Sequence, residues 1–235
     1  MENLIRRAFL QGMYDCSPFI LVIAPFGLLF GVVAAEAGLN LLETLGMTVL
    51  VIAGASQFTA LALLTEQAPT FIVIAAALAV NLRMAMYSAA LVPHLGAASL
   101  KMRALAAYFM VDQSFAVAIK KYEAEQGFSL SQKLAYYFGC AAIICPFWYG
   151  CSALGALVGQ AIPKSYSLDF AIPICFIALV APMLRSLPHL IAALVSVLCA
   201  LLLAWMPYNL WLLVAAIIAM AAGAQSERWL EVRRG

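Results

Sequence analysis

The sequence places one permanent cation and one carboxyl group inside otherwise apolar runs. Arg83 is the only full charge between residues 70 and 92, and Asp112 is the only acidic residue in the run 104–119. A charge at membrane depth is costly, and such residues usually face the interior of a helical bundle or a wet cavity. Because opposite charges at matched depth offset each other's loss of solvation, we expect Arg83 and Asp112 to be partners.

Further polar residues are predicted at the same depth. Ser56 and Gln57 lie slightly past the middle of another apolar run, and Asn81 accompanies Arg83. Together with Gly54, Ser56 and Gln57 indicate a break in a helix, where freed backbone groups can face a ligand. Such a break is tolerated at membrane depth only where protein or a cavity encloses it.

A purely structural role is the alternative for these residues. Arg83 and Asp112 would then lock helices together, and the other polar side chains would hydrogen-bond between helices. The convergence of five polar residues on one layer favours a site or a pathway. Tyr87 follows Arg83 by one turn on the same helix face, so a hydrogen bond between them is expected.

The composition predicts an all-α, polytopic transmembrane bundle. Hydrophobic residues make up 66% of the 235 residues and charged residues 10%, against about half and about a quarter in soluble domains. Apolar runs of about 20 residues match a hydrocarbon layer of about 30 Å. We expect eight spans, some of them broken, at about 17–38, 44–64, 70–92, 104–119, 133–158, 168–184, 188–206 and 208–225.

Basic residues indicate the orientation of these spans. With the N-terminus in the cytoplasm, eight spans put nine basic residues on the inner side: Arg6, Arg7, Lys120, Lys121, Lys133, Arg185, Arg228, Arg233 and Arg234. The outer side receives Lys101, Arg103 and Lys164. Since inner loops are enriched in Lys and Arg, both termini are predicted to be cytoplasmic, with Lys101 and Arg103 as a local exception.

A weak internal sequence similarity suggests repeated halves. Pro25-Phe26 reappears as Pro146-Phe147, and at the same offset Ala35 meets Ala156. Gly38 and Gly159 also match. Many transporters have such repeats, although chance among small residues explains the matches equally well. We expect a single transporter domain over 1–235, with possible repeat halves at about 1–120 and 121–235.

Several other classes of function are not favoured. The net charge of +2 is small and scattered, which argues against nucleic acid as a partner. The six cysteines lack C-x-x-C pairs, and neither a metal cluster nor a cofactor motif is expected. An intramembrane serine hydrolase using Ser56 would need a nearby base, but His94 and His189 lie at span ends. We do not expect an enzyme.

Several motifs resemble those of a known family. AGASQF at 53–58, N-L-R at 81–83 with Tyr87-Ser88 after it, and D-Q-S-F-A at 112–116 resemble the AzlC family, the large subunit of bacterial branched-chain amino acid exporters. CPFWYGCSALGALVG and FAIPICFIALVAPML are similar to the second half of that family. The resemblance implies a bacterial inner-membrane transporter that works with a small AzlD-type membrane subunit.

Two positions depart from the family pattern. Family members often carry His directly after the Arg, where this chain has Met84, and an acidic residue after the Asp, where it has Gln113. Both changes remove a titratable group from the expected site. The substrate and the ion coupling are therefore left open by the resemblance.

The hypothesis is alternating-access export of a branched-chain or similar apolar amino acid. Arg83 would bind the carboxylate, aided by amides near Gly54, and Asp112 would bind the ammonium group or carry a proton. The candidate substrate-binding residues are Gly54, Ala55, Ser56, Gln57, Asn81, Arg83, Tyr87 and Asp112. The candidate pocket and gating residues are Pro25, Phe26, Gly27, Phe58 and Gln113. A passive channel, or an auxiliary subunit without its own substrate site, is the alternative.

Overall fold

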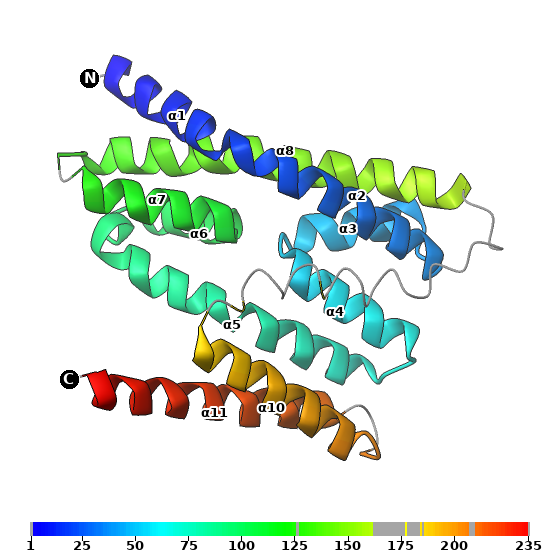
Figure 1. Cartoon of the computed structure of the whole chain (residues 1–235). Coiled ribbons are helices and arrows are strands. Elements are labelled where there is room, and N and C mark those ends of the chain that lie inside the picture. Colours follow the sequence, from blue (N-terminus) through cyan, green and yellow to red (C-terminus); the bar gives the residue numbers. More distant parts are fainter. Residues whose placement is uncertain are drawn as a thin grey trace. The chain divides into compact units, whose positions relative to one another are not determined.

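A computed structural model describes residues 2–125, 127–161, 177, 184, 186–206 and 210–234, and all regular structure within them is helical (Figure 1). The predicted all-α class is confirmed. The helices are α1 (Glu2–Cys16), the 3-10 turn η1 (Ser17–Phe19), α2 (Ile20–Glu36), α3 (Leu41–Leu50), α4 (Gly54–Thr65), α5 (Thr70–Leu95), α6 (Leu100–Tyr108), α7 (Asp112–Ala124), α8 (Leu130–Ala161), α10 (Leu187–Leu203) and α11 (Leu210–Arg234).

Four helical stretches are long and apolar enough to cross a membrane: Asn3–Glu36, Thr70–Leu95, Leu130–Ala161 and Leu210–Leu230. They correspond to the first, third, fifth and eighth predicted spans. The seventh corresponds to α10, which has 17 residues. The sixth, at 168–184, falls almost entirely outside the described residues.

The second and fourth predicted spans are not single helices. The second is divided into α3 and α4, and the break precedes Gly54 at residues 51–53. Val51 has an extended backbone (φ −133°, ψ 95°), which ends α3. The fourth is divided into α6 and α7, with Val111 extended (φ −132°, ψ 160°). The break near Gly54 was predicted at this position, whereas the break within the fourth span had no specific prediction.

Helices α1, η1 and α2 form one continuous rod that lies along α8 (Figure 1). The two run in parallel, because Gly12 meets Tyr136 near one end and Gly159 meets Val32 near the other. In the middle, a Cβ on Gly31 would overlap the backbone of α8 at Ser152. Small residues let membrane helices approach this closely. In lipid, such close packing drives helix association, because the hydrophobic effect does not act between helices there.

Helices α6 and α7 form a hairpin beside the second half of α5. Met110, between the two helices, accepts a hydrogen bond at its sulfur from Ser88 (3.8 Å) in the body of α5. Tyr122, near the end of α7, packs against His94 near the end of α5, with ring centroids 5.2 Å apart. Helix α7 therefore runs in the direction of α5, and α6 runs against it.

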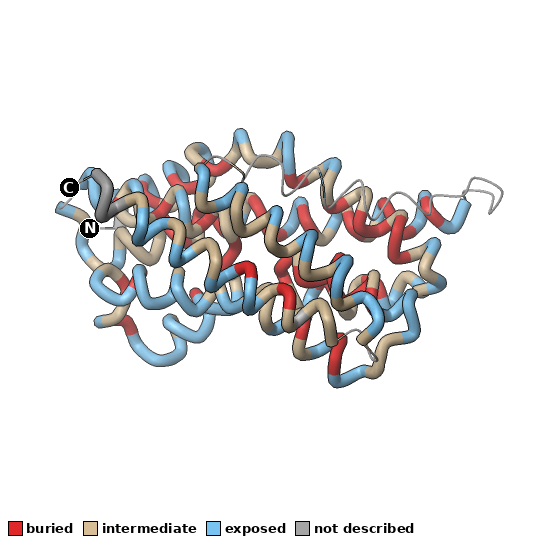
Figure 2. Tube along the Cα trace, turned by 60° about the horizontal axis from the view of Figure 1, so that its bottom comes forward, coloured by how far each residue is buried: buried red, intermediate tan, exposed pale blue. Residues whose placement is uncertain are grey.

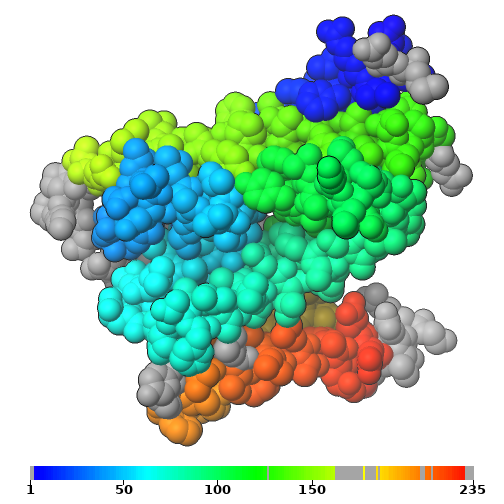
Figure 3. Space-filling view, turned by 180° about the vertical axis from the view of Figure 1, so that it is seen from behind, coloured from blue at the N-terminus to red at the C-terminus, as the bar shows by residue number. Residues whose placement is uncertain are grey.

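The hairpin also packs on α8. The Tyr137 hydroxyl of α8 donates to the Ala106 carbonyl of α6 (2.8 Å), and the Tyr122 hydroxyl of α7 donates to the Lys133 carbonyl of α8 (2.7 Å). The space-filling view shows the green α6–α7 hairpin and the blue α3 against yellow-green α8 (Figure 3). Buried and exposed positions alternate along these helices (Figure 2).

The described chain divides into two compact units. Unit 1 comprises Met1–Gln57 and Asn81–Leu168, and unit 2 comprises Phe58–Val80 and Asp169–Gly235. Unit 2 contains an α10–α11 pair in which a Cβ on Gly223 would lie 3.2 Å from the Cβ of Ala192. All the polar contacts discussed below belong to unit 1. The single transporter domain and its repeat halves remain predictions.

Candidate substrate site

Arg83 and Asp112 form the predicted ion pair. Nη1 of Arg83 lies 3.0 Å from Oδ2 of Asp112, and the two side chains are 23% and 39% exposed. The contact is through one nitrogen and one oxygen. A two-point guanidinium–carboxylate contact would be stronger and more rigid.

Three polar atoms of this region are buried and make no hydrogen bond within the described chain: Nε of Arg83, Oδ1 of Asp112 and Oδ1 of Asn81. A buried polar atom without a partner costs about 1–3 kcal/mol. Two of these atoms belong to the ion pair itself and have opposite character, one donor and one acceptor. A ligand that carries both an acceptor and a donor would satisfy both.

The hairpin tip between α6 and α7 positions Asp112. It is the first residue of α7, where the positive end of the helix dipole favours a carboxylate. The turn before it is fixed by the Ser114 hydroxyl, which accepts from the Val111 N–H (3.1 Å) and donates to the Val111 carbonyl (3.0 Å). The local structure therefore holds the carboxylate at mid-length of α5, where Arg83 lies.

Tyr87 lies beside the ion pair and also contacts α7. Its ring stacks on Phe115 of α7, with centroids 4.1 Å apart and planes 10° from parallel. The stacking attaches the first turn of α7 to α5 next to the ion pair. Gln113, on the same turn of α7, is partly exposed.

Gln57 belongs to a second polar cluster, centred on Trp148 of α8. The indole N–H of Trp148 donates to Oε1 of Gln57 (3.2 Å), and Nε2 of Gln57 donates to Oγ1 of Thr48 (3.3 Å). Gln57 and its neighbour Ser56 are almost completely buried. The Gln57 amide therefore joins α4, α3 and α8.

Gly54 lies against aromatic rings at the start of α4. A Cβ there would come within 2.8 Å of Phe26 and 2.9 Å of Trp148, and the Phe26 and Trp148 rings are 5.8 Å apart. Gly27 also lies against Trp148, and a Cβ on this glycine would be 3.3 Å from the indole ring. The absence of a side chain at Gly54 lets the broken helix approach α2 and α8.

A hydroxyl group connects the two broken segments. Tyr108, the last residue of α6, donates to the Val49 carbonyl near the end of α3 (2.8 Å). Its oxygen also lies 3.4 Å from the hydroxyl of Tyr149 on α8. Because α3 breaks after Leu50, the Val49 carbonyl has lost the helical partner that it would otherwise have. Tyr108 replaces that partner.

The remaining predicted residues lie in α2 and α4. Pro25 is inside α2 and exposed, and Phe58 is completely buried. Ala55 is half-buried in the first turn of α4. Trp148, Tyr108 and Tyr149 were missed, since an aromatic residue in an apolar run carries no positional signal. The resemblance of the CPFWYG stretch to the family included Trp148 and Tyr149 but gave them no role.

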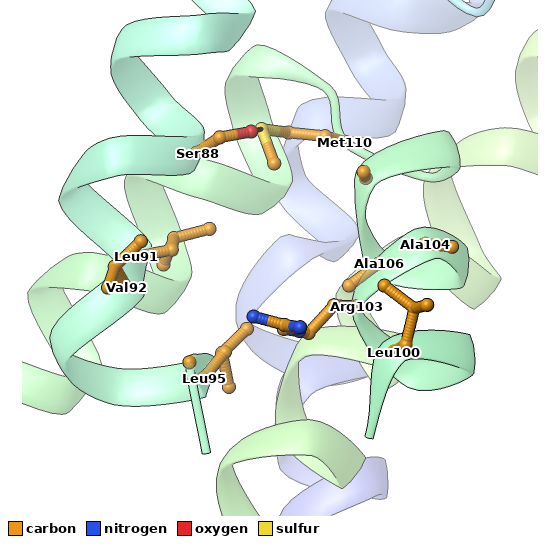
Figure 4. Close-up of a pocket in the computed structure, with 11 residues that line it drawn as sticks. Ser88, Leu91, Val92, Leu95, Leu100, Arg103, Ala104, Ala106 and Met110 are labelled. Atoms are coloured by element: carbon orange, nitrogen blue, oxygen red, sulfur yellow. Dashed lines mark hydrogen bonds between the residues drawn. The ribbon is translucent and has the colours of Figure 1, made fainter. Parts of the chain in front are cut away.

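An apolar groove of about 440 Å³ lies between the end of α5 and α6. Figure 4 shows Ser88 and Met110 pointing toward each other at one end of it and Arg103 extending toward Leu95 at the other. The groove confirms that α6 folds back along α5. The Arg83–Asp112 pair does not line it.

Comparison with known proteins agrees with this arrangement of motifs. The sequence profile described as "AzlC protein" matches residues 18–162, a range that contains both polar clusters. The chain belongs to the AzlC family. No solved structure matches this AzlC-family chain.

Curated relatives are named as membrane proteins. The AzlC-family chain is 31% identical over 190 residues to an uncharacterized membrane protein of Archaeoglobus fulgidus, covering 79% of this chain and 80% of the relative. It is 26% identical over 220 residues to an uncharacterized membrane protein of Helicobacter pylori, covering 91% and 94%. It is 26% identical over 176 residues to the inner membrane protein YgaZ of Escherichia coli, covering 72% and 71%. The chain is a membrane protein with transmembrane helices.

Proposed function

We propose that this chain is a transporter of the bacterial inner membrane that exports branched-chain or similar apolar amino acids. It acts together with a small AzlD-type membrane subunit and draws on an ion gradient. It does no covalent chemistry on its substrate. Membership of the AzlC family supports a transport-related role, and the resemblance of its motifs to branched-chain amino acid exporters supports the substrate class.

The incomplete ion pair carries the proposal. Nε of Arg83 is a buried donor without an acceptor in the described chain, and Oδ1 of Asp112 is a buried acceptor without a donor there. The carboxylate of an amino acid accepts hydrogen bonds and its ammonium group donates them. A zwitterion could thus bind to both partners, with or without separating Arg83 from Asp112.

The surroundings of the pair suit an apolar substrate. Beside it lies the Tyr87–Phe115 stack, and binding sites for small molecules combine a largely apolar wall with a few oriented polar groups. Asp112 is the candidate proton carrier, because its carboxylate can exchange Arg83 for a proton or for the substrate ammonium group. Export would follow from alternating access to this layer.

The test is counterflow of labelled leucine, isoleucine and valine in membrane vesicles that contain the chain, with and without an AzlD-type subunit. We expect saturable counterflow that Arg83→Ala and Asp112→Ala abolish while the protein remains inserted. Lys101→Ala, which removes an exposed cation of α6, is the matched control and should keep counterflow.

Other outcomes would replace the proposal by an alternative. Flux that rises linearly with concentration and does not discriminate among solutes would indicate a passive channel. Normal counterflow in both Arg83→Ala and Asp112→Ala would reject the assignment of these two residues to a substrate site. The chain would then be interpreted as an auxiliary subunit.

A further inference from the structure

Two segments, α3–α4 and α6–α7, are broken near their middle, and the first helix of each is too short to cross a membrane. Helix α3 has 10 residues and α6 has 9, which at 1.5 Å per residue is about 15 Å or less, half of a hydrocarbon layer of about 30 Å. Helix α3 ends at the extended Val51. After α6 the chain becomes extended at Val111, directly before α7 begins. Each of the two short helices can therefore reach the middle of the bilayer and no further.

The chain reverses at both breaks. At the second break, Met110 contacts Ser88, and residues of α6 line a groove with the end of α5. Tyr122 of α7 packs on His94, so both helices lie along the same half of α5. At the first break, the Gln57 amide donates to Thr48 at 3.3 Å. Nine residues of continuous helix would separate these residues by about 13 Å along the axis, so the first turn of α4 lies beside the last turn of α3.

Helix α5 separates the two reversals and is long enough to span the membrane, with 26 residues. The α3–α4 segment leads into the beginning of α5, and the α6–α7 hairpin follows its end. We propose that α3–α4 and α6–α7 are re-entrant hairpins that enter the membrane from opposite faces, and that their tips meet where Tyr108 bonds to Val49.

The returning helices of the two hairpins have the same three residue types, Ser, Gln and Phe, near their starts, with Ser and Gln in opposite order. The returning helix of the first begins at Gly54 and continues with Ser56-Gln57-Phe58, and that of the second begins at Asp112 and continues with Gln113-Ser114-Phe115. Each hairpin also follows a long helix, α2 or α5. In the proposed topology a long helix followed by a hairpin occurs twice with opposite orientation, which is the inverted-repeat arrangement that places transporter sites at midplane.

The distribution of charge supports this topology over straight spans. Helix α1 runs parallel to α8, so its N-terminus shares a face with the start of α8 and the end of α5. That face then carries Arg6, Arg7, Lys101, Arg103, Lys120, Lys121 and Lys133. On the other face, the connections from α2 to α3 and from α4 to α5 are flanked by Glu36, Glu43 and Glu66 and hold no basic residue. Lys101 and Arg103, which eight straight spans would put on the outer side, now lie with the other basic residues. The basic face is then cytoplasmic.

The re-entrant topology makes a prediction that does not depend on any transport activity. Four alanines lie at or next to the connections around the hairpins: Ala37, Ala68 and Ala97 in connections, and Ala124 at the last position of α7. Each is replaced singly by cysteine, and a membrane-impermeant maleimide is applied to intact and to permeabilised spheroplasts. The unsubstituted chain, with its six native cysteines, gives the background.

We expect Ala37→Cys and Ala68→Cys to react in intact spheroplasts, and Ala97→Cys and Ala124→Cys only after permeabilisation. Straight spans would put Ala37 and Ala68 on opposite faces, and likewise Ala97 and Ala124. Either of those separations would overturn the proposal. Leu39→Cys and Gly127→Cys are second reporters for the first and last connections if a substituted chain does not accumulate.

Discussion

At the scale of single residues, the ion pair is the contact that the sequence predicted most directly. Arg83 and Asp112 are opposite charges in apolar runs, and the structure places them 3.0 Å apart. Tyr87, expected to hydrogen-bond Arg83, lies beside the pair and stacks on Phe115, and the bond to Arg83 remains a prediction. A charge in lipid requires an opposite charge, whereas a tyrosine has several adequate partners. Only the first requirement is strong enough to identify a contact.

A double substitution separates the structural role of the pair from its functional role. Arg83→Ala or Asp112→Ala alone leaves a partly buried charge without a partner, which we expect to lower the free energy of unfolding by about 3 kcal/mol. The double variant removes both charges and should regain most of that loss, yet remain inactive in counterflow. Unfolding in detergent and counterflow measure the two effects. A double variant that transports would contradict the assigned role.

The Tyr108 hydroxyl provides a second test at this scale. Tyr108→Phe removes the donor to the Val49 carbonyl and leaves that acceptor without a partner, so we expect a loss of about 1–3 kcal/mol in unfolding free energy. Tyr14→Phe is the control, because Tyr14 is 79% exposed. Equal stability of the two variants would show that the contact between the tips contributes nothing.

At the scale of helices, composition and the length of the apolar runs predicted most of the long elements. The expected span 70–92 is α5, and the expected span 133–158 lies within α8. The break after α3 was signalled by Gly54 and its polar neighbours. The break before α7 had no such signal, because Phe109, Met110 and Val111 are apolar and include neither glycine nor proline. Hydrophobicity alone predicts one span for that segment.

The contact of α2 with α8 can be tested by adding a single methyl group. Gly31→Ala would place a Cβ against the α8 backbone at Ser152, whereas at Gly150 on α8 a Cβ meets nothing within 4 Å. We expect Gly31→Ala to lower the unfolding free energy by about 2 kcal/mol through overpacking. Gly150→Ala, the matched control, should be neutral or slightly stabilising. Thermal unfolding in detergent distinguishes them, and equal shifts would contradict the packing.

At the scale of the whole molecule, the chain forms two units that share helices. Unit 1 holds both polar clusters and both breaks, and the chain passes between the units within α4 and again within α5. Compact units are a different property from a sequence repeat, so the possible repeat halves at about 1–120 and 121–235 remain a prediction. The observed units are discontinuous in sequence, because long-range packing and not chain order groups the helices.

The topology of the molecule predicts how it tolerates added charge. Ala37→Lys with Ala68→Lys adds cations to the acidic face of the proposed arrangement, and Ala97→Lys with Ala124→Lys adds them to the basic face. Because cations disfavour translocation, the first pair should reduce the amount of membrane-integrated protein severalfold and the second should not. Immunoblots of washed membranes measure this yield. Equal yields from the two pairs would support straight spans.

The sequence by itself determined that this is a helical membrane protein with a charged pair at mid-depth. Those conclusions follow from the hydrophobic length of the segments and from the cost of a lone charge in lipid, and both are local properties. The tertiary structure decided that two of the apolar segments reverse at their centres. A reversal at that depth is stable only where distant groups satisfy the freed backbone and side chains. Here Tyr108 does so for Val49 and Trp148 for Gln57, and no local pattern specifies those partners.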